Sequence, residues 1–182
     1  MDFRQNFLKL LERIDARHQL KWYLKQKQCL GMVIGQNTHI FSKIGGAEPY
    51  LISIGSNTTI STNVTILTHD ASIGAIVGRE NASDLIGSVT IGNHVFIGSG
   101  AIIMYGCAIG DYCIVAAGSV VTKSIPAGNV VGGNPARIIC STEYFVQKSK
   151  SHFFSLHGKA KGTKRSAILS SPDKFIVRKE MK

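Results

Sequence analysis

The stretch 90-TIGNHVFIGSGAIIMYGCAIGDYCIVAAGSVVT-122 places a branched aliphatic residue at every sixth position. The returning residues are Ile91, Ile97, Ile103, Ile109, Val115 and Val121. Small or medium-sized residues stand four positions after them, at Val95, Ala101, Cys107, Cys113 and Ser119. A period of six fits neither the period of about 3.6 of a helix nor the alternation of hairpin strands. An earlier block keeps the same step, at Ile54, Ile60 and Ile66.

This period indicates a solenoid in which three short strands form one triangular coil. Each aliphatic residue points inward and stacks on its equivalent one coil away, and the small residue fills a corner. Cys107 and Cys113 are therefore expected to be buried core residues and not reactive thiols. None of the four cysteines forms a Cys-x-x-Cys pair. Neither a zinc site nor a disulfide framework is indicated, and a reducing, cytoplasmic setting is expected.

The repeat divides the chain into three expected parts: an N-terminal helical segment at 1–30, a β-helix at 31–142 and an extension at 143–182. The helix is predicted because Phe3, Phe7, Leu10, Leu11 and Ile14 fall on one face. Two interruptions break the repeat, at 43–51 and at about 70–84, and the second resembles a protruding loop. Composition predicts little order at 157–174.

The net charge of +10 is concentrated in the flanks. Residues 1–28 carry +4 and residues 143–182 carry +7, whereas residues 29–142 carry −1. Basic flanks attract nucleic acid, anionic lipid or a nucleotide cofactor, or they are merely solvated. No apolar run is long enough for a transmembrane helix, and the first residues lack the apolar centre of a secretory signal.

The chain resembles the left-handed β-helix acyltransferases, in particular the galactoside and maltose O-acetyltransferases and their relatives that act on surface polysaccharides. The resemblance covers roughly residues 31–140, and the motifs that carry it are 91–100, 116–123, 125–126 and 133–137. It implies a mainly β fold with left-handed parallel coils. It also implies a homotrimer whose active sites lie between neighbouring coils and bind acetyl-CoA as co-substrate.

By the same resemblance, His69 is the general base that deprotonates an acceptor hydroxyl. Asp70 is also a candidate catalytic residue, either orienting the base or binding the acceptor, although it could be a solvated loop carboxylate. The oxyanion donor maps onto the backbone at Ser99. The expected acetyl-CoA contacts are Phe96, Gly98, Ser99, Ala117, Gly118, Thr122, Lys123 and Arg137. The chain departs from the family where a tryptophan becomes Phe96 and a second arginine becomes Cys140.

A metal site is not expected. Related carbonic anhydrases hold their metal with three histidines, two of them five residues apart, and no His-x-x-x-x-His occurs within the repeat region at 31–142. The resemblance therefore implies an acetyl-CoA-dependent O-acetyltransferase of a sugar hydroxyl, in surface polysaccharide synthesis. An N-acetyltransferase or a serine acetyltransferase is the alternative on the same fold. A scaffold or nucleic-acid-binding protein is the non-enzymatic alternative, and we expect no nucleic-acid partner. The basic flanks could rest on an anionic membrane.

Overall fold

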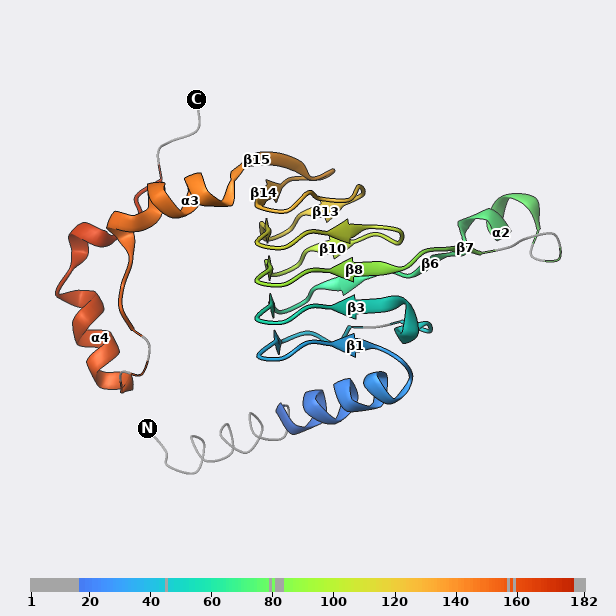
Figure 1. The fold of residues 1–182 in the computed structure, drawn as a ribbon, viewed down its shortest axis with the longest axis horizontal. Helices are drawn as coiled ribbons and strands as arrows, with labels where there is room; N and C mark the ends of the chain where they lie inside the picture. Colours follow the sequence, from blue (N-terminus) through green and yellow to red (C-terminus); the bar gives the residue numbers. More distant parts are fainter. Residues whose placement is uncertain are drawn as a thin grey trace. The chain divides into compact units, whose positions relative to one another are not determined.

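The computed structural model describes residues 17–178 except 45, 79, 81–83, 157 and 159. The apolar face expected at residues 3–14 lies outside the described part. The described residues fall into two compact units, and the boundary along the chain lies between Thr142 and Glu143. The first unit is a stack of short strands with one helix at its end and one projecting arm (Figure 1).

The elements follow one another along the chain with short turns between most of them. The strands are β1 (Val33–Ile34), β2 (His39–Ile40), β3 (Ile52–Ile54), β4 (Thr59–Ile60), β5 (Thr65–Ile66), β6 (His69–Asp70), β7 (Leu85–Ile86), β8 (Val89–Ile91), β9 (Phe96–Ile97), β10 (Ile102–Ile103), β11 (Ala108–Ile109), β12 (Ile114–Val115), β13 (Val120–Val121), β14 (Asn129–Gly132) and β15 (Arg137–Ser141). The helices are residues 17–29, η1 (Pro49–Leu51), α2 (Ser72–Val77), α3 (Thr142–Ser149), η3 (Lys150–His152), α4 (Lys161–Leu169) and η4 (Pro172–Lys174).

Three sheets form the walls of the coil, and successive coils add parallel strands to each. Their strand orders are β1-β3-β8-β11, β2-β4-β9-β12-β14-β15 and β5-β10-β13, with only β15 antiparallel to its neighbour. In the register, Ile91 pairs with Ile109, which confirms the predicted eighteen-residue stack. Ile54 pairs with Ile91 across the arm, so the inserted residues leave the stack in register.

The core is the row of inward aliphatic residues that the repeat predicts. Ile60, Ile97, Ile103 and Val115 are all fully buried. Cys107 and Cys113 are buried too, at 3% and 0% exposure, as expected for small corner residues. Buried polar side chains have partners: the Thr58 hydroxyl donates to Gly92 O at 2.9 Å, and the Ser119 hydroxyl donates to Ala116 O at 2.7 Å. The mainly parallel β prediction is therefore confirmed.

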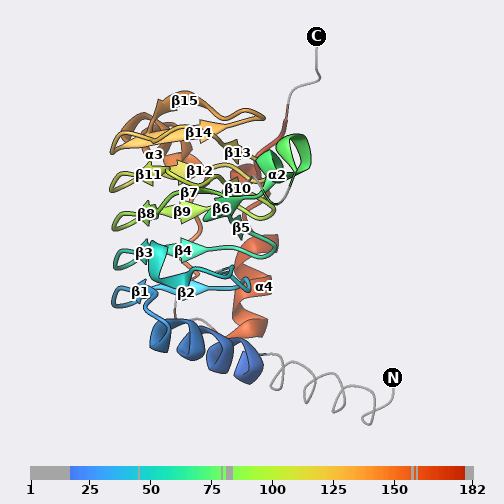
Figure 2. The same ribbon diagram turned by 90° about the vertical axis from the view of Figure 1, so that its right-hand side faces the viewer.

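Two elements lie outside the stack of strands, namely the N-terminal helix and the arm. The helix at residues 17–29 lies against the first coil, where the Tyr23 hydroxyl donates to Ile44 O at 3.0 Å and Lys27 Nζ donates to Gly46 O at 3.0 Å. The arm consists of β6, α2 and β7; it projects away from the coils in Figure 1 and points towards the viewer in Figure 2. It carries exposed apolar residues, among them Ile76 and Ile86.

The described residues of the second unit are largely helical, and over 161–174 the expectation of little order was wrong, whereas residues 157 and 159 lie outside the described part. Residues 161–169 form α4, and η4 follows at Pro172–Lys174. Lysine, arginine, alanine and leucine are good helix formers, so local propensity outweighs a composition that suggested disorder. Within the described residues, no helix is both long and apolar enough to span a membrane.

Replacing the inward Ile103 by Ala should destabilise the coil by about 2–5 kcal/mol, because it leaves a cavity in a packed interior. Ile102 lies next to it in β10 and faces outward, partly exposed, so Ile102→Ala should cost about 1 kcal/mol or less. Denaturant unfolding of both variants would measure the difference. Equal losses would mean that Ile103 does not carry the core as described.

Candidate active site

His69 lies at the corner where the arm leaves the coil. It begins β6 directly after the buried Thr68, and it pairs across the arm with Ile86 of β7. The Gly87 N–H donates to Thr68 O at 2.9 Å and closes the neck of the arm. The backbone around His69 is thus held from the coil side and from the arm side, which fixes the position of its imidazole.

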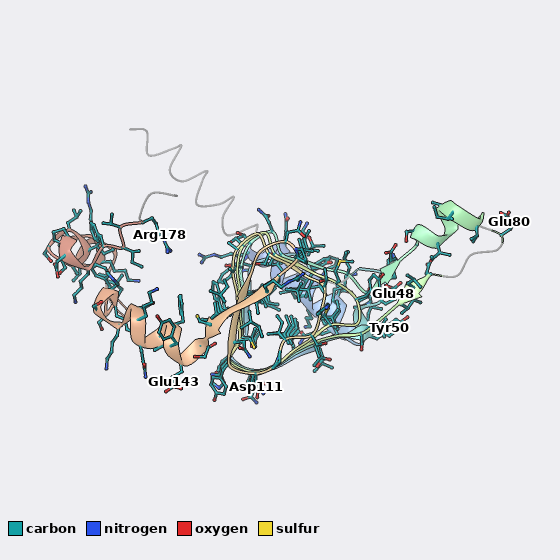
Figure 3. All side chains as sticks on the ribbon, turned by 90° about the horizontal axis from the view of Figure 1, so that it is seen from above. Glu48, Tyr50, Glu80, Asp111, Glu143 and Arg178 are labelled. Carbon is teal, nitrogen blue, oxygen red and sulfur yellow. The ribbon has the colours of Figure 1, made fainter. Side chains whose placement is uncertain are left out.

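A carboxylate from the preceding coil holds this imidazole. Glu48 Oε2 lies 2.8 Å from His69 Nδ1, and the same oxygen accepts a hydrogen bond from the Thr68 hydroxyl at 2.7 Å. The two side chains are only 39% and 18% exposed. Figure 3 looks down the coils and shows Glu48 at the base of the arm. With its Nδ1 proton donated to Glu48, His69 keeps Nε2 as a free basic nitrogen.

The electrostatics of the pair favour a charged imidazole. The hydrogen bond to Glu48 raises the pKa of His69, and the negative charge of Glu48 acts in the same direction. The hydrogen bond from Thr68, followed by that from His69, lowers the pKa of Glu48. Both shifts stabilise a carboxylate beside an imidazolium. Glu48 therefore stabilises the positive charge that His69 would gain on accepting a proton.

Asp70 makes different contacts from those of a base-orienting residue. One carboxylate oxygen accepts the Ser72 N–H at 2.8 Å, and the other accepts the Tyr105 hydroxyl at 3.3 Å. The hydrogen bond from the Ser72 main chain is the largest cause of the lowered pKa of Asp70. Asp70 thus joins the start of α2 to the next coil. No hydrogen bond joins it to His69 in the described structure, and its catalytic role stays a prediction.

Glu48 was not predicted as a site residue, although the sequence contained a signal for it. The interruption at 43–51 comes directly before β3, and the one at 70–84 comes before β7 and then β8; β3 and β8 are neighbours in the β1-β3-β8-β11 sheet. They therefore leave the stack at the same corner of successive coils. A carboxylate in the first interruption and a histidine beside the second are placed together by that geometry.

The predicted contacts Gly98, Ser99, Ala117 and Gly118 form stacked turns, one leading from β9 to β10 and the other from β12 to β13. The Gly118 N–H donates to Ser99 O at 2.9 Å, which joins the two turns. Gly98 is buried, and a Cβ there would collide with the main-chain nitrogen of Ala117. A glycine is thus required at 98 by the packing of the next coil, independently of any ligand.

These turns present unused main-chain donors. At another corner, side chains satisfy the equivalent groups: Asp111 Oδ1 accepts the Asn93 N–H at 2.7 Å. Figure 3 shows Asp111 at a corner away from the arm. The N–H groups of Ser99 and Ala117 have no acceptor among the described residues, although both residues are exposed. Two donors on adjacent coils are therefore available to carbonyl or amide oxygens of a ligand.

Lys123 and Arg137 come together at the far end of the stack. Both line a groove of about 400 Å³, with Ser124, Pro126 and Ile138. Two cations on one groove suit the phosphates of a nucleotide. Thr122 directly precedes Lys123 and is exposed, and Phe96 on β9 is 44% exposed and available to pack on a ligand.

Within one chain, the general base and the turns with free N–H donors lie at opposite ends of the strands of one sheet. His69 follows β5, whereas Ser99 and Ala117 precede β10 and β13 of the same β5-β10-β13 sheet. Thr122 and Lys123 follow β13, at the strand end where His69 follows β5. The structure thus joins Ser99 to Gly118 and Lys123 to Arg137 but does not bring all the predicted cofactor residues together. Across the described ranges, no group of at least three His, Cys, Asp or Glu side chains is arranged to hold a metal ion.

Comparison with known proteins identifies the repeat. Residues 88–123 match the bacterial transferase hexapeptide (six repeats) family. Protein CapG of Staphylococcus aureus is 37% identical over 145 residues, covering 78% of this chain and 80% of CapG. The putative acetyltransferase YvoF of Bacillus subtilis (strain 168) is 42% identical over 102 residues, covering 56% and 55%. The galactoside O-acetyltransferase of Escherichia coli (strain K12) is 37% identical over 106 residues, covering 58% and 52%. The chain spans about half the length of the last two relatives.

Solved structures share the fold. A maltose O-acetyltransferase from Clostridium difficile 630 is 35% identical and superposes with a TM-score of 0.54, over 61% of this chain and 59% of that one. The hexapeptide-repeat acetyltransferase VCA0836 of Vibrio cholerae O1 biovar eltor, complexed with acetyl coenzyme A, is 26% identical with a TM-score of 0.52. That likeness covers 64% of this chain and 74% of the other.

Replacing Glu48 by Gln should lower the pKa of His69 towards its ordinary value of about 6.5, because the raising hydrogen bond and charge are lost. Neutral imidazole then forms at lower pH than in the parent protein. Titration of the His69 ring by NMR would measure the shift. Asp70→Asn is the control and should move the pKa less, since Asp70 is the weakest of the groups that raise it. An unchanged titration in Glu48→Gln would contradict the pairing.

Proposed function

Because this chain belongs to the hexapeptide-repeat transferase family, we propose that it transfers the acetyl group of acetyl-CoA to a saccharide hydroxyl. The observation that carries the proposal is the 2.8 Å contact between Glu48 and His69, which prepares a general base. The galactoside and maltose O-acetyltransferases among the relatives support the saccharide, and the acetyl coenzyme A complex of VCA0836 supports the donor. We extend the proposal to a saccharide of a surface polysaccharide or its precursor.

In the proposed reaction, His69 Nε2 takes the proton of the acceptor hydroxyl, and the oxygen attacks the thioester carbonyl carbon of acetyl-CoA. Glu48 stays ionised and stabilises the imidazolium that forms. The tetrahedral intermediate collapses with cleavage of the carbon–sulfur bond. The departing thiolate takes the proton from His69, so the products are the acetyl ester and CoA, and the base is restored.

The remaining predicted residues bind the donor. The free N–H of Ser99 serves as the oxyanion donor, and the free N–H of Ala117 donates a hydrogen bond to a carbonyl oxygen of the pantetheine arm. Lys123 and Arg137 bind phosphates in their shared groove. Phe96, Gly98, Gly118 and Thr122 line the path between these points. Placing both reactants in one cleft supplies a large part of the rate.

The proposed enzyme is a trimer of left-handed coils. Two observations support assembly: His69 lies at another corner from Ser99 and Ala117, and the arm leaves apolar side chains such as Ile76 exposed, at 84%. A neighbouring chain would bring its turns to the His69 corner and cover the arm. Light scattering of the full chain should give the mass of three copies, and a monomeric mass at full activity would refute the assembly.

An acceptor screen that detects thiol release from acetyl-CoA tests the proposal as a whole. It should include free sugars, nucleotide sugars, oligosaccharides, serine and amines. Release with hydroxyl-bearing saccharides supports the proposal. Release with serine alone or with amines alone would replace the saccharide hydroxyl by those acceptors, because the base and cofactor residues are the same in each case.

His69→Ala should lower turnover by about 10²–10⁴-fold, as loss of a positioned general base does. Binding of acetyl-CoA, measured by calorimetry, should stay nearly unchanged because His69 contacts the acceptor proton and not the nucleotide. Glu48→Gln should lower turnover less than His69→Ala does, since the general base remains. Turnover close to that of the parent in His69→Ala would remove the assignment of the base.

Lys123→Ala and Arg137→Ala should each weaken acetyl-CoA binding about tenfold, the usual loss for a hydrogen bond to a charged group. The effect should appear in the Michaelis constant for acetyl-CoA and leave turnover at saturation nearly intact. Lys25→Ala, an exposed lysine on the N-terminal helix, is the matched control. Unchanged affinity in both variants would refute the proposed phosphate contacts.

A further inference from the structure

The second unit exposes apolar side chains, and none of its described residues is fully enclosed. In its described residues between 143 and 178, no side chain is buried. Phe153, Leu169 and Phe175 are exposed, and Ile176 and Val177 are exposed at 57% and 87%. An exposed apolar surface of this kind marks a contact with another molecule.

Residues 152–154 contact residues 174–175, and the short apolar run Phe175–Val177 begins at this contact. We call this run the apolar tip. The His152 ring Nδ1 donates to Lys174 O at 2.9 Å, and Lys174 Nζ donates to Phe153 O at 3.5 Å. The rings of Phe154 and Phe175 lie 6.1 Å apart. The tip therefore starts from a fixed point, and its last two aliphatic side chains extend outward.

Cations flank this tip along the chain. Residues 143–182 hold ten Lys and Arg against three Asp and Glu, whereas residues 29–142 are close to neutral. Lys174 directly precedes the tip and Arg178 directly follows it. None of the following basic side chains forms an ion pair with a residue that the structure describes: Lys148, Lys150, Lys164, Arg165, Lys174 and Arg178.

We propose that this unit docks on the surface of an anionic lipid bilayer. The apolar tip enters the boundary between headgroups and acyl chains, and the cations lie over the lipid phosphates. The inference does not depend on the acetyl transfer proposed above, because no residue of the unit takes part in that reaction.

Charge and side-chain type favour the bilayer over other occupants. A second copy of the unit would bring +7 against +7, and the repeat region at 29–142 carries only −1, so neither offers a complementary charge. Nucleic acid would match the cations, but it offers Ile176 and Val177 only phosphates and stacking bases. An anionic bilayer offers negative charge to the cations and an apolar interior to the aliphatic side chains.

Flotation of the full chain with vesicles tests the proposal. The chain should bind vesicles of equal parts phosphatidylcholine and phosphatidylglycerol, and it should not bind phosphatidylcholine alone. Raising the salt concentration should weaken the binding, because it screens the charges. Binding to both vesicle types alike, or to neither, would overturn the proposal. So would retention on single-stranded or duplex nucleic acid without any vesicle binding.

Paired variants assign the binding to this surface. Ile176→Ser/Val177→Ser should lower the partition about tenfold or more through lost apolar burial, whereas Val33→Ser, an exposed valine on β1, should not. Lys164→Gln/Arg165→Gln should lower it by about fivefold for each charge removed.

The matched charge control, Lys21→Gln/Lys25→Gln, removes the same charge from the N-terminal helix and should have little effect. Thermal unfolding monitored by circular dichroism checks that the coil is intact in each variant. Equal losses in the variants and their controls would overturn the assignment to the second unit.

Discussion

Stacking of inward side chains from one coil onto the next is the constraint on which the rest of the molecule depends. Ile91 pairs with Ile109, and Ile97 with Val115, so every inward position has a partner directly above or below it. Where Gly98 meets Ala117, there is no space even for one methyl group. A coil packed this closely cannot hold extra residues inside, and insertions must leave through the corners.

The chemistry of the site follows from that restriction. Two insertions leave at one corner of successive coils. One brings Glu48 and the other brings His69, so a rigid stack sets the 2.8 Å contact between two chain segments that are otherwise irregular. The free N–H groups of Ser99 and Ala117 arise in the same way, because stacking fixes the turns and no side chain satisfies them.

The sequence alone predicted the repeat and the burial of Cys107 and Cys113, because both depend on a fixed step along the chain. It missed Glu48, since the length of an insertion does not reveal where its side chains meet the next coil. It also missed α4, whose residues have helical propensity within a composition typical of disorder. The hand of the coil came from the family resemblance, because a period of six is the same for either hand.

The neck of the arm has a consequence for how such a protein can change. One hydrogen bond, from Gly87 N–H to Thr68 O, closes the arm where it leaves the stack, and Ile54 and Ile91 pair across it as if nothing were inserted. The residues of the arm can therefore be exchanged without disturbing the coils on either side of it. Mutation or recombination can lengthen, shorten or replace it with little penalty to folding, while the histidine at its root stays in place. In the acetyl transfer proposed above, acceptor preference would then change while the coils keep their packing.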